Sequence, residues 1–126
     1  MNLALDDKQG KSLFGFTHAC NGLKSVIRTE RNFRIHLVIA FGVILAGLVF
    51  RLAIIKWLMI IFAIGLVLIT EMLNTAIEKM LDYLKPDIHP SAKMIKDIAA
   101  GAVLVSAIIA AVIGLIVFIP EFDSLL

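Results

Sequence analysis

Charged residues, cysteine and tryptophan are scarce in this sequence of 126 residues. Asp, Glu, Lys and Arg make up 17% of it, against about a quarter in soluble domains, whereas hydrophobic residues make up 60%. The single cysteine, Cys20, excludes an intrachain disulfide framework. Gly10, Lys11 and Ser12 end like a P-loop, but Leu5 stands where that motif needs its first glycine. The low content of charged residues and the high content of hydrophobic residues predict a small integral membrane protein of one domain, residues 1–126.

The apolar residues of the chain are grouped into helix-length segments. Residues 12–31 predict an amphipathic helix with an apolar stripe and basic residues on its other faces, which suits a membrane interface. Three membrane spans are predicted over residues 33–50, 57–84 and 96–119. The predicted fold is therefore an all-α membrane protein with an N-terminal interfacial helix and three transmembrane helices.

Proline and the basic residues predict where the spans end and how they are oriented. Pro86 and Pro90 predict a break between the second and third spans, and Pro120 is expected to end the third. Lysine and arginine gather before the first span and around this break, whereas the other loop has only Arg51 and Lys56. The positive-inside rule then places the N-terminus in the cytoplasm. We expect no cleavable signal peptide, because residues 1–12 are polar and no Ala-x-Ala type of cleavage site follows the first apolar run.

A stripe of polar residues interrupts the second span. Glu71, Asn74, Glu78 and Asp82 fall within about 80° of one another on a helix. An ionisable residue in an apolar run costs free energy and usually has a function. Three carboxylates on one helix edge repel each other unless a cation lies among them. The pattern indicates a metal-phosphate site at a membrane surface.

Three classes of function compete for this stripe. A proton-coupled transporter could use Glu71 alone, and a structural membrane subunit would need no polar cluster. A phosphotransferase explains the cluster best, because carboxylates hold Mg²⁺, a lysine neutralises phosphate charge and another carboxylate takes a proton from an acceptor hydroxyl. Other readings stay open for three sites: Glu30 as a solvated charge, Lys96 with Asp97 as an ordinary helix start, and His89 as a loop residue.

The segment from Glu71 to Glu78, together with Asp82, resembles the signature of the small prokaryotic diacylglycerol kinase family. The resemblance covers the chain from about residue 15 to residue 120. It includes residues 28–34, the spacing from Asp82 to Lys96, and Lys96-Asp97 before an alanine-rich span. Residues 33–36, 89–93 and 114–120 resemble the Gram-positive branch, whose members are similar to undecaprenol kinases.

This resemblance implies MgATP as phosphate donor, a membrane lipid alcohol as acceptor, and a homotrimer in a bacterial cell membrane with active sites shared between protomers. No nucleic acid is expected as a partner. It implies Glu71 as general base, with Asn74 orienting Glu71 or the substrate, and Glu30 and Glu78 as Mg²⁺ ligands. The implied nucleotide contacts, which include both metal ligands, are Lys11, His18, Glu30, Glu78, Asp87, Ile88, His89, Lys96 and Asp97. The implied lipid contacts are Glu71, Arg34 and Ala100.

Three positions depart from the Gram-negative members of the family. Lys11 replaces an arginine, His36 a glutamate and Ala100 a serine. These positions lie around the lipid or nucleotide entry. The acceptor therefore stays open between undecaprenol and a diacylglycerol.

Overall fold

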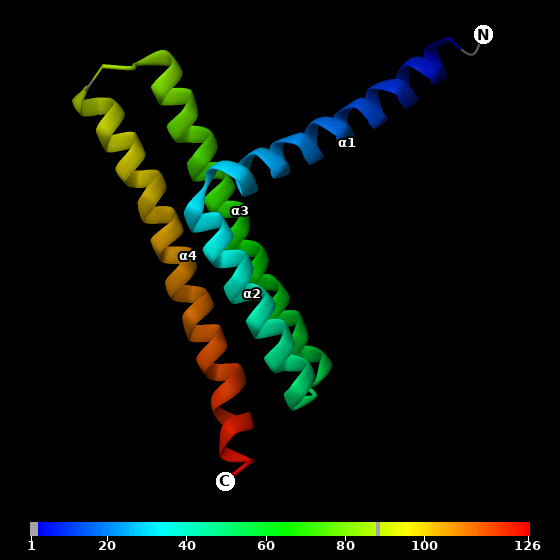
Figure 1. Ribbon diagram of the computed structural model, residues 1–126, viewed down its shortest axis with the longest axis vertical. Coiled ribbons are helices and arrows are strands. Elements are labelled where there is room, and N and C mark those ends of the chain that lie inside the picture. The colour runs from blue at the N-terminus through cyan, green and yellow to red at the C-terminus, as the bar shows by residue number, and fades with distance from the viewer. Residues whose placement is uncertain (1–2, 88) are drawn as a thin grey trace. The chain divides into compact units, whose positions relative to one another are not determined.

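The computed structural model describes residues 3–87 and 89–126, with side chains from Leu13 onward (Figure 1). This part of the chain forms the helices α1 (Leu3–Thr29), α2 (Arg31–Phe50), α3 (Ile54–Leu84) and α4 (Pro90–Asp123). The chain divides into two compact units, Met1–Arg31 and Asn32–Leu126. The all-α prediction is confirmed; the homotrimer and the single domain stay predictions.

The first unit is the helix α1, which begins well before its predicted start at residue 12 and ends at Thr29. The prediction was too short because polar residues without a proline do not prevent a helix. Leu13 and Phe16 are 70% and 71% exposed, and Leu23 is also exposed. An exposed apolar stripe of this kind suits a membrane surface, and the interfacial position of α1 stays a prediction.

The second unit contains three helices long and apolar enough to cross a membrane. At about 1.5 Å per residue, the 20 residues of α2 span roughly 30 Å, the thickness of a hydrocarbon layer. The 31 residues of α3 and the 34 of α4 span roughly 46 and 51 Å, so they continue beyond such a layer. Figure 1 shows α3 and α4 side by side, running past the start of α2.

The connection from α2 to α3 is a tight helix cap. Arg51 has φ 53°, its N–H donates to the Leu48 carbonyl, and the Leu52 N–H donates to the Gly47 carbonyl. This is the Schellman arrangement, with an arginine at the left-handed position that glycine usually occupies. Because the reversal takes so few residues, α3 begins at Ile54 rather than at the predicted residue 57.

The break between α3 and α4 is confirmed, but α4 begins earlier than predicted. Pro90 occupies the first turn of α4, where its missing N–H costs nothing. His89 is the N-cap, and its Nδ1 accepts a hydrogen bond of 3.1 Å from the Ser91 N–H. The helix therefore starts at Pro90 and not at residue 96.

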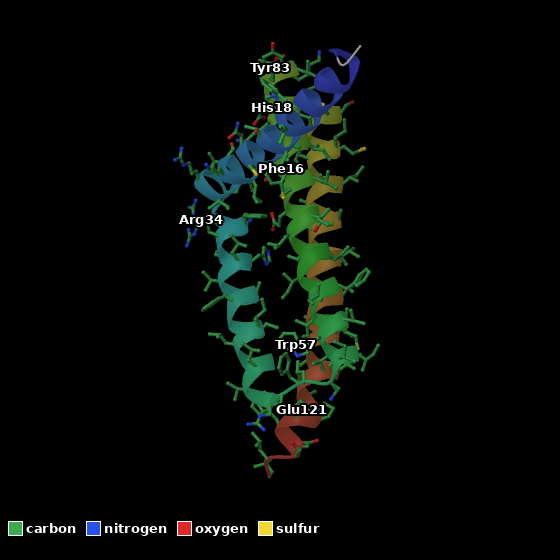
Figure 2. The ribbon with its side chains drawn as sticks, turned by 90° about the vertical axis from the view of Figure 1, so that its right-hand side faces the viewer. Phe16, His18, Arg34, Trp57, Tyr83 and Glu121 are labelled. Carbon is green, nitrogen blue, oxygen red and sulfur yellow. The ribbon has the colours of Figure 1, made fainter. Side chains whose placement is uncertain are left out.

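The prediction that Pro120 ends the third span is wrong. Pro120 lies inside α4, which continues to Asp123. Membrane helices tolerate proline where other groups satisfy the freed backbone atoms. Beside Pro120, an ion pair joins α3 to α4, with Lys56 Nζ 2.6 Å from Glu121 Oε1. Figure 2 shows Glu121 and Trp57 near one end of the three-helix unit and Tyr83 near the other.

The core of the second unit lies at the end where Trp57 and Glu121 are found. Leu52, Ile60 and Val117 are buried together, with Trp57 and Phe118 among the half-buried side chains packed on them. Farther along α3 and α4, the hydroxyls of Thr70 and Ser106 lie 2.8 Å apart. Ser106 is 2% exposed, so this polar pair fixes the two helices inside an otherwise apolar contact.

Candidate active site

Glu71 is a buried carboxylate on α3, 5% exposed, in the half of the helix beyond its most apolar run. Its Oε1 lies 3.1 Å from Nε2 of His36 on α2. Helix rise explains why they meet: His36 stands roughly 21 Å before the end of α2, and Glu71 roughly 26 Å after the start of α3. The sequence predicts a functional role for Glu71, and the structure adds the side chain that lies beside it.

Asn74 and Glu78 form the next part of the stripe. Asn74 Nδ2 lies 3.4 Å from Glu78 Oε1, a long hydrogen bond between residues one helical turn apart. The Asn74 Oδ1 atom is buried and has no hydrogen-bond partner. Such an atom is costly in an apolar place unless a bound group satisfies it. The amide is therefore available to a substrate hydroxyl, an ion or a water.

Asp82 and Lys96 join the end of α3 to the start of α4. Lys96 Nζ lies 2.5 Å from Asp82 Oδ1, and Lys93 Nζ lies 2.8 Å from Asp97 Oδ2. Both pairs are largely exposed, so each contributes little to stability. They nevertheless gather two lysines and two carboxylates beside the loop between α3 and α4, where the sequence predicts nucleotide contacts. The sequence predicts a cation among the carboxylates of the stripe. Beside Asp82, that cation is the ammonium group of Lys96.

The remaining predicted residues are spread over both units. His18 is exposed on α1 with its ring 5.0 Å from that of Phe14, and Glu30 follows the end of α1 in the first unit. Arg34 and Ala100 are exposed on α2 and α4 (Figure 2 labels Arg34). Asp87 is exposed in the loop before α4, whose N-cap is His89. Ile88 and the side chain of Lys11 lie outside the described residues. Because Glu30 and Glu78 belong to different units, the predicted metal pair stays a prediction.

Sequence reasoning missed three contacts. It linked His36 to the lipid or nucleotide entry and not to Glu71, and it assigned no contact to Glu121 or Ser106. Counting helix rise from the tight connection at Arg51 could have paired His36 with Glu71. No comparable signal points to the other two contacts, because they depend on how α4 packs against its neighbours.

The residues of the stripe fit a magnesium ion that is shared with a substrate. The described residues contain no group of three or more His, Cys, Asp or Glu side chains that could hold a metal by themselves. Mg²⁺ is commonly bound by one or two carboxylates together with substrate phosphates and waters. The Glu78 carboxylate and the unpartnered Asn74 oxygen provide such a partial ligand set.

Comparison with known proteins identifies relatives of this chain. Residues 17–118 match the family model described as prokaryotic diacylglycerol kinase. An undecaprenol kinase of Bacillus subtilis is 45% identical over 84% of this chain and 86% of that protein. A diacylglycerol kinase of Synechocystis is 38% identical over 90% of this chain and 66% of that protein. A diacylglycerol kinase of Helicobacter pylori is 32% identical over 78% of this chain and 74% of that protein.

Three helices of membrane-spanning length and composition indicate a multi-pass membrane protein. The chain belongs to the prokaryotic diacylglycerol kinase family. It is a lipid kinase, a phosphotransferase whose acceptor is an alcohol. Family membership argues against the transporter and structural-subunit interpretations of Glu71.

Proposed function

We propose that this protein transfers the γ-phosphoryl group of MgATP to the hydroxyl of undecaprenol, giving undecaprenyl phosphate and ADP. The observation that carries the chemistry is the burial of Glu71, 5% exposed in an apolar helix. The choice of acceptor is supported by the 45% identity to the Bacillus subtilis undecaprenol kinase. The alternative acceptor, a diacylglycerol, is supported by the relatives from Synechocystis and Helicobacter pylori.

In the proposed mechanism Glu71 accepts the proton of the lipid hydroxyl while the hydroxyl oxygen forms a bond to the γ-phosphorus. The bond from the γ-phosphorus to the bridging oxygen breaks, and ADP leaves with that oxygen. A general base must lie within hydrogen-bond reach of the hydroxyl, and a base near the hydrocarbon layer can meet an alcohol that stays in the membrane. Asn74, three residues after Glu71 on α3, is proposed to orient Glu71 or the substrate. The transfer is direct and in line, without a phosphoenzyme.

Nucleotide binding is assigned to the polar ends of α3 and α4. Lys96 lies 2.5 Å from Asp82, and its ammonium can move to the phosphates and neutralise their charge. Glu78, with Glu30, would hold Mg²⁺, and Asn74 adds an oxygen beside Glu78. When bound, the ion would neutralise charge on the phosphates.

The remaining nucleotide contacts are proposed at Lys11, His18, Asp87, Ile88, His89 and Asp97. Arg34 and Ala100 are proposed to contact the lipid. The active site is proposed to face the cytoplasm, where ATP is found, and the protein to act as a homotrimer with shared sites in the bacterial cytoplasmic membrane.

The test is a kinase assay on purified protein in mixed micelles with Mg²⁺ and labelled ATP. Undecaprenol and a diacylglycerol are offered separately, with Glu71→Gln as the control. We expect phosphate transfer to undecaprenol at the higher kcat/KM and loss of most activity in Glu71→Gln, with unchanged oligomer size. Preference for the diacylglycerol would overturn the acceptor. Near wild-type rates in Glu71→Gln would overturn the general base.

A further inference from the structure

His36 contributes the contact that crosses from α2 to the buried carboxylate. Its Nε2 lies 3.1 Å from Oε1 of Glu71, and the two side chains are 25% and 6% exposed. As the proposed general base Glu71 is a carboxylate, which accepts hydrogen bonds and does not donate them, so a hydrogen bond across this distance has its hydrogen on Nε2 of the imidazole. Oε2 then stays available as the atom that accepts a proton.

The surroundings of His36 make this hydrogen bond strong. The imidazole also lines a cavity of about 360 Å³ between α2, α3 and α4, where it is the one ionisable group among the described lining residues. The other walls are apolar, for example Ala40 and Val43 on α2, Val67 on α3 and Gly114 on α4. These apolar walls offer the imidazole no other hydrogen-bond acceptor side chain among the described lining residues. A hydrogen bond in such surroundings is stronger than one in water.

We propose that His36 is the positioning residue of the phosphoryl transfer. By donating from Nε2 to Oε1 of Glu71, it fixes the rotamer of the glutamate and directs Oε2 to the acceptor hydroxyl. A glutamate has three rotatable side-chain bonds, and a buried one without a partner samples orientations in which the proton transfer does not occur. This inference rests on the proposed role of Glu71 as the general base.

Two variants of His36 separate hydrogen bonding from packing. His36→Leu keeps an apolar side chain of moderate size and removes the donor, whereas His36→Gln keeps an N–H donor at a similar reach. Val49→Ala, on an exposed position of the same helix, is the matched control. The assay measures kcat and the KM for ATP with undecaprenol in mixed micelles, beside Glu71→Gln.

We expect His36→Leu to lower kcat by about tenfold or more, because a hydrogen bond to a charged group is lost, with the KM for ATP unchanged. We expect His36→Gln to recover most of that loss. A wild-type kcat in His36→Leu overturns the inference, and so does an equal loss in both variants. A Glu71→Gln enzyme with near wild-type activity would refute the role of Glu71 as general base. An inactive Glu71→Gln enzyme together with a wild-type kcat in His36→Leu would refute only the role of His36.

A spectroscopic measurement tests the same contact without activity. In the wild-type protein labelled with ¹⁵N-histidine, we expect the neutral His36 imidazole to carry its proton on Nε2. A neutral tautomer with the proton on Nδ1 would overturn the inference, even where the His36→Leu protein does not fold.

Discussion

Gly47 lies where α2 comes closest to Trp57, and adding one methyl group there tests the packing of the connection between α2 and α3. A Cβ atom built on Gly47 would lie 2.7 Å from Cη2 and 3.0 Å from Cζ2 of Trp57, and 3.1 Å from Cδ1 of Leu52. Carbon atoms in contact normally stay about 3.5–4.0 Å apart, so the indole must shift. Gly42 on the same helix is the matched control, because a Cβ there meets no atom within 4 Å.

Gly47→Ala and Gly42→Ala make the same chemical change on one helix, so the contribution of helix propensity cancels in their difference. What remains is overpacking, which typically costs about 1–3 kcal/mol. We therefore expect the free energy of unfolding of Gly47→Ala to lie about 2 kcal/mol below that of Gly42→Ala.

The assay is unfolding by a denaturing detergent from mixed micelles, followed by fluorescence. Trp57 is the single tryptophan of the chain, so its emission reports directly on the crowded site. Gly47→Ala should also shift the emission of the folded protein, whereas Gly42→Ala should leave it unchanged. Equal unfolding free energies and equal spectra in the two variants would refute this packing of α2 on α3.

Three further predictions concern the ion pair, the hydroxyl pair and the metal. Glu121→Gln, which removes the charge facing Lys56, should lower the free energy of unfolding by about 1 kcal/mol. The control Asp123→Asn, at an exposed position, should leave it unchanged, and equal unfolding free energies in the two variants would contradict the ion pair between Lys56 and Glu121. Ser106→Ala should lower the free energy of unfolding by about 0.6 kcal/mol, since it loses the hydrogen bond to α3, and an unchanged value in the same titration would argue against that bond. Glu78→Ala should raise the Mg²⁺ concentration for half-maximal activity steeply, and an unchanged Mg²⁺ titration would make Glu78 merely structural.

Local sequence features determined the helices and the family. Runs of apolar residues give membrane-length helices whatever their neighbours, and Pro86 and Pro90 end one helix and open the next through their fixed backbone angle and missing N–H. The stripe from Glu71 to Asp82 could be predicted from the sequence, because helical periodicity alone places its members on one face. Helix ends were less predictable: α1 and α4 begin earlier than expected, and Pro120 does not end α4.

Tertiary structure decided which polar groups meet. The pairing of His36 with Glu71 depends on α2 and α3 being in register, and that register follows from the left-handed Arg51 and the Leu52 cap. The contact of Ser106 with α3 depends on how α4 packs. The Ser106 contact joins residues far apart in the chain, and no period or spacing in the sequence encodes it. The sequence determined by itself that a carboxylate stands in an apolar helix. Only the packing of the neighbouring helices decided that Glu71 is buried and that His36 lies beside it, because most apolar residues of α3 stay exposed.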